Sequence, residues 1–177
     1  VTSACGTPSA APSPTPSTTP TASAAPTATT ATRLSPNAAA DLLRASIKGT
    51  RPLLIPTTVP DTWLADVKIE STTSFTATYR EPTGAKTFTL TLAAANPPLP
   101  TANTVQSHPK FHGDASSLYQ VADGTNPTSD RFIIWVETGV WPGWPNPGVP
   151  YLVSTAGIGE TEFWQLTNGL HPDQIGG

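Results

Sequence analysis

The sequence is short of charge, of cysteine and of long apolar runs, and each shortage excludes a class of protein. Only 12% of the 177 residues are charged, with 9 Lys and Arg against 12 Asp and Glu. Nucleic-acid-binding proteins show clustered Lys and Arg, so a nucleic-acid partner is not expected. No apolar run approaches the roughly 18 residues that a membrane-spanning helix requires. Methionine is absent, and the single cysteine excludes a disulfide within the chain.

Proline is abundant instead, with 21 residues, many of them near the N-terminus. From Thr7 to Thr32 every residue is Ala, Pro, Ser or Thr. Such a segment cannot bury enough apolar surface to offset its conformational entropy, so we expect residues 1–32 to form a disordered tether and residues 33–177 a single folded domain. Proline favours the extended polyproline II conformation, which gives the tether a reach of roughly 80 Å. A linker cut from a larger protein would have the same composition.

The cysteine lies directly ahead of this tether, in "VTSACG". Ser3 and Ala4 before Cys5 resemble the lipobox of bacterial lipoproteins, a family in which the cysteine becomes the first mature residue and carries the lipid. The resemblance implies that Cys5 is lipidated and that the membrane is a partner through this lipid. The protein would then be extracytoplasmic, anchored to the outer face of the bacterial cell membrane. The alternative is a free thiol on a disordered tail, which is a chemical liability.

The folded domain is expected to begin with a short amphipathic helix. Ser35 is a suitable N-cap, Pro36 suits the first helical position, and Gly49 can end the helix. The stripe expected to pack on a sheet consists of Ala39, Leu42, Leu43, Ser46 and Ile47. Residues 51–63 follow as an extended entry segment, because their prolines exclude a continued helix.

Alternation of apolar and polar residues then predicts strands. In "SFTATYR" and "KTFTLTL", aromatic and aliphatic residues alternate with threonine, and "EPTG" between them predicts a hairpin turn. These strands indicate a sheet with one packed face and one threonine-rich face in water. "WLADVKIES" predicts a preceding strand, with Leu64, Val67 and Ile69 apolar and a slip in phase at Ala65–Asp66.

The second half of the domain predicts further strands and a closing helix. "SLYQVADG" is a short strand, and "DRFIIWVETG" is the most apolar one, with Trp135 on the face opposite Phe132. "PYLVST" is expected to be the final strand, followed by a helix in "GIGETEFWQLTNGL" that carries Leu170 and is closed by Gly169 or the His171-Pro172 pair. An order of helix, about six strands and helix predicts an α+β fold with one curved antiparallel sheet.

Three segments carry a resemblance to a known family. "IPTTVPDTW", the strand "FIIWVETG" and "VPYLVSTAGIGETEFWQL" are similar to bacterial extracytoplasmic domains of the DUF4367 type, which often sit on lipoproteins or behind anti-sigma-factor membrane helices. The resemblance spans residues 51–170. It implies a sensing, binding or scaffold module outside the cytoplasm, and the family has no established catalytic residues to transfer.

The strongest candidate for binding is "GVWPGWPNPGVPY", residues 139–151. Its prolines restrict the backbone, so ordering Trp141 and Trp144 on a partner costs little further entropy, and indoles are favoured at interfaces. Together with Tyr151 they are expected to bind an envelope protein or a glycan. Either indole could instead fold back over the edge of the sheet. The long proline-punctuated segment 96–117 is a second candidate, because irregular stretches of this length are often functional.

Residues for catalysis or metal binding are sparse. In "SHPKFHGD", His108 and His112 have a spacing that binds zinc on a helix, but Pro109 and Gly113 oppose a helix. They are therefore weak metal candidates, and two exposed loop histidines are the alternative. Glu137 is the carboxylate best placed to be functional, or else a charge at the sheet edge. No nucleophile elbow or phosphate-binding glycine loop occurs, so neither an enzyme nor a cofactor is expected.

The leading interpretation is a non-catalytic, membrane-anchored lipoprotein that binds a partner protein or an envelope component. The alternative is a carrier or sensor of a lipid or other apolar ligand, held between the sheet and the helices. That alternative requires a cavity lined by Phe75, Tyr79, Phe88 and Trp135.

Overall fold

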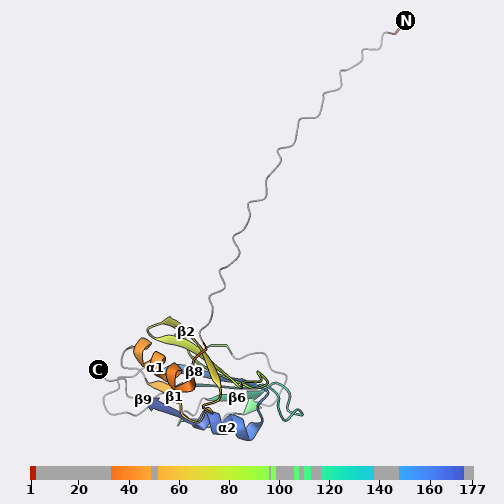
Figure 1. Cartoon of the computed structure of the whole chain (residues 1–177). Helices are drawn as coiled ribbons and strands as arrows, with labels where there is room; N and C mark the ends of the chain where they lie inside the picture. The colour runs from red at the N-terminus through yellow and green to blue at the C-terminus, as the bar shows by residue number, and fades with distance from the viewer. Residues whose placement is uncertain are drawn as a thin grey trace. The chain divides into compact units, whose positions relative to one another are not determined.

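The structure is a computed structural model that describes residues 1–2, 33–48, 52–95, 97–98, 106–107, 110–112, 117–137 and 148–173. The chain divides into two units, Val1–Thr30 and Ala31–Gly177. Cys5 and the predicted tether, apart from residues 1–2, lie outside the described residues. The second unit is an α+β domain, which confirms the predicted fold class (Figure 1).

Most of the described strands belong to one antiparallel sheet, in the order β2-β3-β4-β8-β7-β6-β5. Their bounds are β2 (Leu64–Ser71), β3 (Ser74–Arg80), β4 (Thr87–Leu92), β5 (Gln106–Ser107), β6 (Leu118–Val121), β7 (Arg131–Glu137) and β8 (Val149–Ala156). The helices are α1 (Pro36–Ser46) and α2 (Glu160–Asn168). A separate two-stranded ribbon pairs β1 (Leu53–Pro56) with β9 (Leu170–Asp173), and in Figure 1 this ribbon lies between the two helices.

One face of the large sheet holds the core. The register places Phe75 opposite Leu92 and Trp135 opposite Tyr151, and none of these four side chains is more than 1% exposed. The helices and the ribbon contribute to the same apolar cluster, through Leu43, Ile47, Leu54, Phe163, Leu166 and Leu170 among others. The opposite face of β3 and β4 carries half-buried threonines, as the alternation predicted.

Helix α1 begins as the sequence predicts. The Ser35 hydroxyl accepts a hydrogen bond from the Ala38 N–H, and Pro36 occupies the first turn. Its buried face consists of Pro36, Ala39, Ala40 and Leu43. Leu42, predicted to belong to the packed stripe, is 38% exposed. The stripe passes through Ala40 instead, because at 3.6 residues per turn this position shares a face with Leu43 and Leu42 does not.

Strand β2 corrects a second expectation. Ala65, Val67 and Ile69 all face the core without a slip in phase, and Leu64 points to the other face, where it is 38% exposed. The irregularity comes later, as a shift in register between Ile69 and Ser71. Counting Leu64 as a core residue produced the apparent slip in phase. Single exposed leucines are common on protein surfaces, so an apolar residue alone does not show which face is buried.

The ribbon and the short strand β5, which lies in the segment expected to be irregular, are the parts of the fold that the sequence did not predict. The extended entry segment forms β1, and Leu170, expected on the closing helix, begins β9. Strand β8 is therefore not the last strand. Helix α2 ends at its C-cap Gly169 as expected. Glycine suits this position because a Cβ here would lie 2.1 Å from the Thr58 hydroxyl oxygen.

Candidate functional site

The residues predicted to bind a partner lie at the hairpin formed by β7 and β8. Glu137 and Val149 are opposite each other in the register and close the base of the loop of residues 138–148. Trp141 and Trp144 lie in this loop, outside the described residues. The described site is therefore the base of the loop and the side chains that hold it.

Glu137 occupies this base and is only 4% exposed. It follows a buried alternation in β7 that also places Ile133 and Trp135 on the core face. Burying a carboxylate is costly unless it is paired and hydrogen-bonded. Here one carboxylate oxygen, Oε2, accepts the indole N–H of Trp135 at 2.9 Å and lies 2.7 Å from Nδ1 of His112. The sequence left open whether Glu137 is a functional carboxylate or a charge at the sheet edge. In the structure it lies inside the protein and not at an exposed edge.

His112 comes from the other segment that the sequence singled out, residues 96–117. Its ring stacks on Phe111 at a centroid distance of 4.2 Å, and its side chain is 21% exposed. Its backbone φ of 49° is left-handed, a region that histidine visits more often than most non-glycine residues. The contact with Glu137 therefore joins the long segment to the base of the tryptophan loop.

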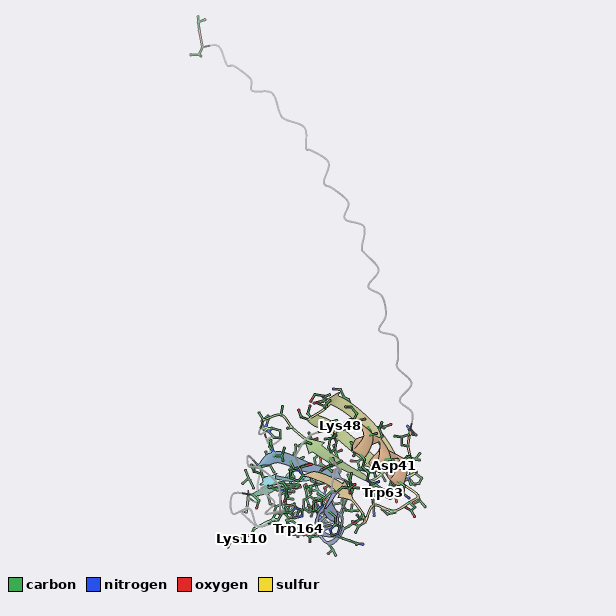
Figure 2. The ribbon with its side chains drawn as sticks, turned by 90° about the vertical axis from the view of Figure 1, so that its left-hand side faces the viewer. Asp41, Lys48, Trp63, Lys110 and Trp164 are labelled. Atoms are coloured by element: carbon green, nitrogen blue, oxygen red, sulfur yellow. The ribbon has the colours of Figure 1, made fainter. Side chains whose placement is uncertain are left out.

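Aromatic rings surround this pair. Trp135 stacks on Tyr151 at 5.6 Å and meets Phe111 edge-on at 4.6 Å. Phe111 also lies 6.4 Å from Trp164 of α2, which is half-buried. Figure 2 shows Trp164 and the exposed Lys110 on the same side of the domain, away from Asp41 and Lys48. The pair is thus fixed by packing on several sides and leaves only part of the imidazole accessible.

Tyr151, predicted to bind a partner with the two tryptophans, is a core residue. Its side chain is 0% exposed, and its hydroxyl donates to the Pro52 carbonyl and accepts from the Leu54 N–H. Desolvation raises the pKa of Tyr151 above its usual range. The side chain has no surface for a partner because the alternation of β8 points it into the core.

The metal candidates are not brought together in the described part of the chain. His108 lies outside it, and Nδ1 of His112 is turned towards Glu137. His171, the remaining histidine, is exposed on β9 opposite Ile55. Among the described residues, no group of three His, Cys, Asp or Glu side chains is placed to hold a metal ion.

The side chains proposed to line a cavity for an apolar ligand are packed into the core. Phe75, Tyr79 and Phe88 are 0% exposed, and Trp135 is 1% exposed. A surface pocket of about 230 Å³ lies elsewhere, at the β3–β4 turn. It is lined by Arg33, Leu64, Asp66, Arg80, Glu81, Pro82, Thr83 and Gly84.

Two features of this region escaped sequence reasoning. Arg131 is only 4% exposed, and its guanidinium donates to the carbonyls of Pro127, Ser129 and Ile158, so it ties the β6–β7 loop to the start of α2. The sequence also does not predict the pairing of Glu137 with His112, although each residue is a candidate on its own. The only sequence signal for this pairing is that Glu137 is an acidic residue at the end of an apolar strand.

In this arrangement Glu137 holds the His112 imidazole and the Trp135 indole at the base of the loop. Within the described residues, no helix is long and apolar enough to span a membrane. Comparisons of the chain with protein-family models, with curated proteins and with solved structures found no match.

Proposed function

We propose that this protein is a non-catalytic binding module of the bacterial cell envelope. Lipid on Cys5 would hold it at the outer face of the membrane, and residues 1–32 would act as a spacer. The loop of residues 138–148 and the segment 96–117 would form one surface for a partner protein. The observation that carries this proposal is the hydrogen bond between Glu137 and His112, which joins the two segments.

The loop base is suited to presenting large side chains to a partner. Binding is weakened whenever a flexible loop must be ordered in the complex. Here the ladder between Glu137 and Val149 fixes both ends of the loop, and Glu137 is held in turn by Trp135. Prolines within residues 139–151 restrict the chain further. Two indoles on such a loop can contribute binding energy at a small entropic cost.

The proposal is tested by replacing both loop tryptophans with alanine. We expect Trp141→Ala with Trp144→Ala to leave the unfolding transition unchanged and to abolish site-specific photo-crosslinking from the loop to a protein in envelope membranes. A matched control is Leu42→Ala, which removes an exposed apolar side chain on α1. Crosslinking that persists at wild-type yield in the double variant would contradict the proposed surface.

The anchor has its own test. Mass spectrometry of the N-terminus from protein isolated from its host should find lipid on Cys5, and Cys5→Ser should move the protein from the membrane fraction to the soluble fraction. An unmodified thiol on membrane-free protein would refute the anchor without bearing on the tryptophan loop. A carrier of an apolar ligand has less support, since the four side chains required for its cavity are packed.

A further inference from the structure

A pocket of about 230 Å³ lies where strand β2 begins and strand β3 ends. Leu64 and Arg80 line it from opposite positions in the register, and the turn from Glu81 to Gly84 lines it as well. Arg33, which precedes helix α1, is a further lining residue. Leu64 is on the face of β2 opposite the core, so the pocket is at the surface. Its volume is below the roughly 300–1,000 Å³ of sites for drug-sized ligands, which suits a molecule of amino-acid size or the end of a peptide.

The two arginines of this pocket have donors that the protein does not use. Nε of Arg80 lies 3.5 Å from Oδ2 of Asp66. Within the described residues, no hydrogen bond or ion pair engages the terminal nitrogens of Arg80 or the side chain of Arg33. A guanidinium stays charged at physiological pH, and its planar fork of N–H groups matches the two oxygens of a carboxylate. The pocket therefore offers free N–H donors to a ligand.

The acidic side chains of the pocket are engaged within the protein. Oδ2 of Asp66 pairs with Arg80, and Oδ1 is buried, so neither oxygen is free for a ligand. Oε2 of Glu81 accepts a hydrogen bond from the Thr83 hydroxyl at 2.9 Å. These two carboxylates still offset the two guanidiniums in charge, so a singly charged anion fits better than a doubly charged one. A ligand carboxylate meets this requirement, and phosphate, which is partly doubly charged at neutral pH, does not.

An apolar surface adjoins these charges. Leu64 is 38% exposed, and it lines the pocket together with Pro82. Moving apolar surface out of water is favourable, so an aliphatic group placed on these two side chains adds to the affinity. The ligand therefore combines a carboxylate with a nearby aliphatic group. An aliphatic amino acid carries both on one carbon atom.

We infer that this pocket binds the α-carboxylate of an aliphatic amino acid, either free or at the C-terminus of a peptide. Arg33 and the terminal nitrogens of Arg80 donate to the carboxylate, while Asp66 positions Arg80. The aliphatic side chain lies on Leu64 and Pro82. This site is separate from the β7–β8 hairpin, because three strands, β3, β4 and β8, lie between β2 and β7.

The test uses the full chain and NMR titration of the backbone amides and the arginine Nε–H groups. N-acetyl-leucine represents a peptide C-terminus, and N-acetyl-leucinamide is its matched neutral control. We expect N-acetyl-leucine to shift the amides of Thr83 and Gly84 and to bind at least about fivefold more tightly than the amide, because the amide lacks the charge-assisted hydrogen bonds. N-acetylglycine, which lacks the aliphatic side chain, and inorganic phosphate should both bind more weakly. Free leucine identifies the source: tighter binding than N-acetyl-leucine indicates a free amino acid, and weaker binding indicates a peptide.

A substitution in the protein tests the arginine directly. Arg33→Gln removes an exposed guanidinium that has no partner in the described part of the chain, and it should weaken N-acetyl-leucine binding at least about threefold. The matched control is Lys48→Gln, which removes the same charge at the far end of the β2–β3 hairpin, where the Lys48 N–H bonds to the Thr72 carbonyl. Equal losses in the two variants would show attraction by net charge alone and would overturn the inference. Equal binding of the amide, of N-acetylglycine or of phosphate, or shifts confined to other strands, would also overturn it.

Discussion

The hydroxyl of Tyr151 donates to the carbonyl of Pro52, the residue before strand β1, at 2.7 Å and accepts from the Leu54 N–H within β1 at 3.1 Å. β1 pairs with β9 along its other edge, so this hydroxyl satisfies part of the edge that faces the large sheet. A side chain of the sheet thus takes the place of a neighbouring strand. It fixes the ribbon over the core.

Removing this hydroxyl should destabilise the domain. Tyr151→Phe would leave the Leu54 N–H buried without a partner, and we expect the free energy of unfolding in urea to fall by about 1–3 kcal/mol. The matched control is Tyr79→Phe, since the Tyr79 hydroxyl is buried without a hydrogen bond in the described part of the chain. That control should be neutral or slightly stabilising. Equal losses from the two variants would contradict the assigned role of Tyr151.

Stability should decrease in alkali. Burial raises the pKa of both Tyr79 and Tyr151 above the usual range, so the folded state favours the neutral phenols. A group whose folded pKa is raised contributes stability that is fully present below its unfolded pKa of about 10 and is lost as the pH rises above that value. We expect tyrosinate absorbance from these residues to appear together with unfolding. Tyrosinate formation in the folded protein near pH ~10 by both residues would argue against their burial.

The contact between Glu137 and His112 should be energetically coupled. Glu137→Ala leaves the Trp135 indole N–H without its acceptor, and a loss of about 2–3 kcal/mol in the free energy of unfolding is expected. Glu137→Gln keeps an oxygen acceptor and should cost less. A double-mutant cycle of Glu137→Gln with His112→Ala should give a coupling of at least ~0.5 kcal/mol. Strict additivity would mean that the two segments are not joined by this bond.

Two glycines with left-handed backbones should differ in their response to alanine. Gly157 has φ +70°, and a Cβ there would lie 2.1 Å from the Ala85 carbonyl oxygen. Gly84 has φ +77° with nothing within 4 Å of the same position. Gly84→Ala should therefore cost only the backbone penalty of about 1–2 kcal/mol, and Gly157→Ala clearly more. Equal midpoints of thermal unfolding for the two variants would contradict this assignment.

Much of the local structure could be predicted from the sequence. The cap at Ser35, the turn at Gly84 and the alternation in β3 and β4 depend on residues close together in the chain, so their patterns are visible without a fold. The errors arose where one residue carried a misleading signal. Leu42 and Leu64 are apolar but exposed, and hydrophobicity alone does not show which side of an element is covered.

The candidate site was predictable only in pieces. The sequence drew attention to Glu137, to His112 and to the tryptophan loop, each for its own reason. It did not show that Glu137 and His112 meet, and it placed Tyr151 at the surface beside the indoles. Which distant segments meet depends on the order of the strands in the sheet. A hydrophobic period of two residues shows which face of a strand is buried, but it does not show which strand lies beside it.

The α+β class, the helix start and the hairpin follow from the sequence alone, because propensity, capping and alternation act over a few residues. The pairing of β1 with β9, the hydrogen bond of Tyr151 to β1 and the contact of Glu137 with His112 are visible only in the folded chain. These contacts join residues that lie far apart in the sequence. They form because β1 and β9 must pack together over the sheet to bury one continuous apolar face, and this packing depends on the whole fold.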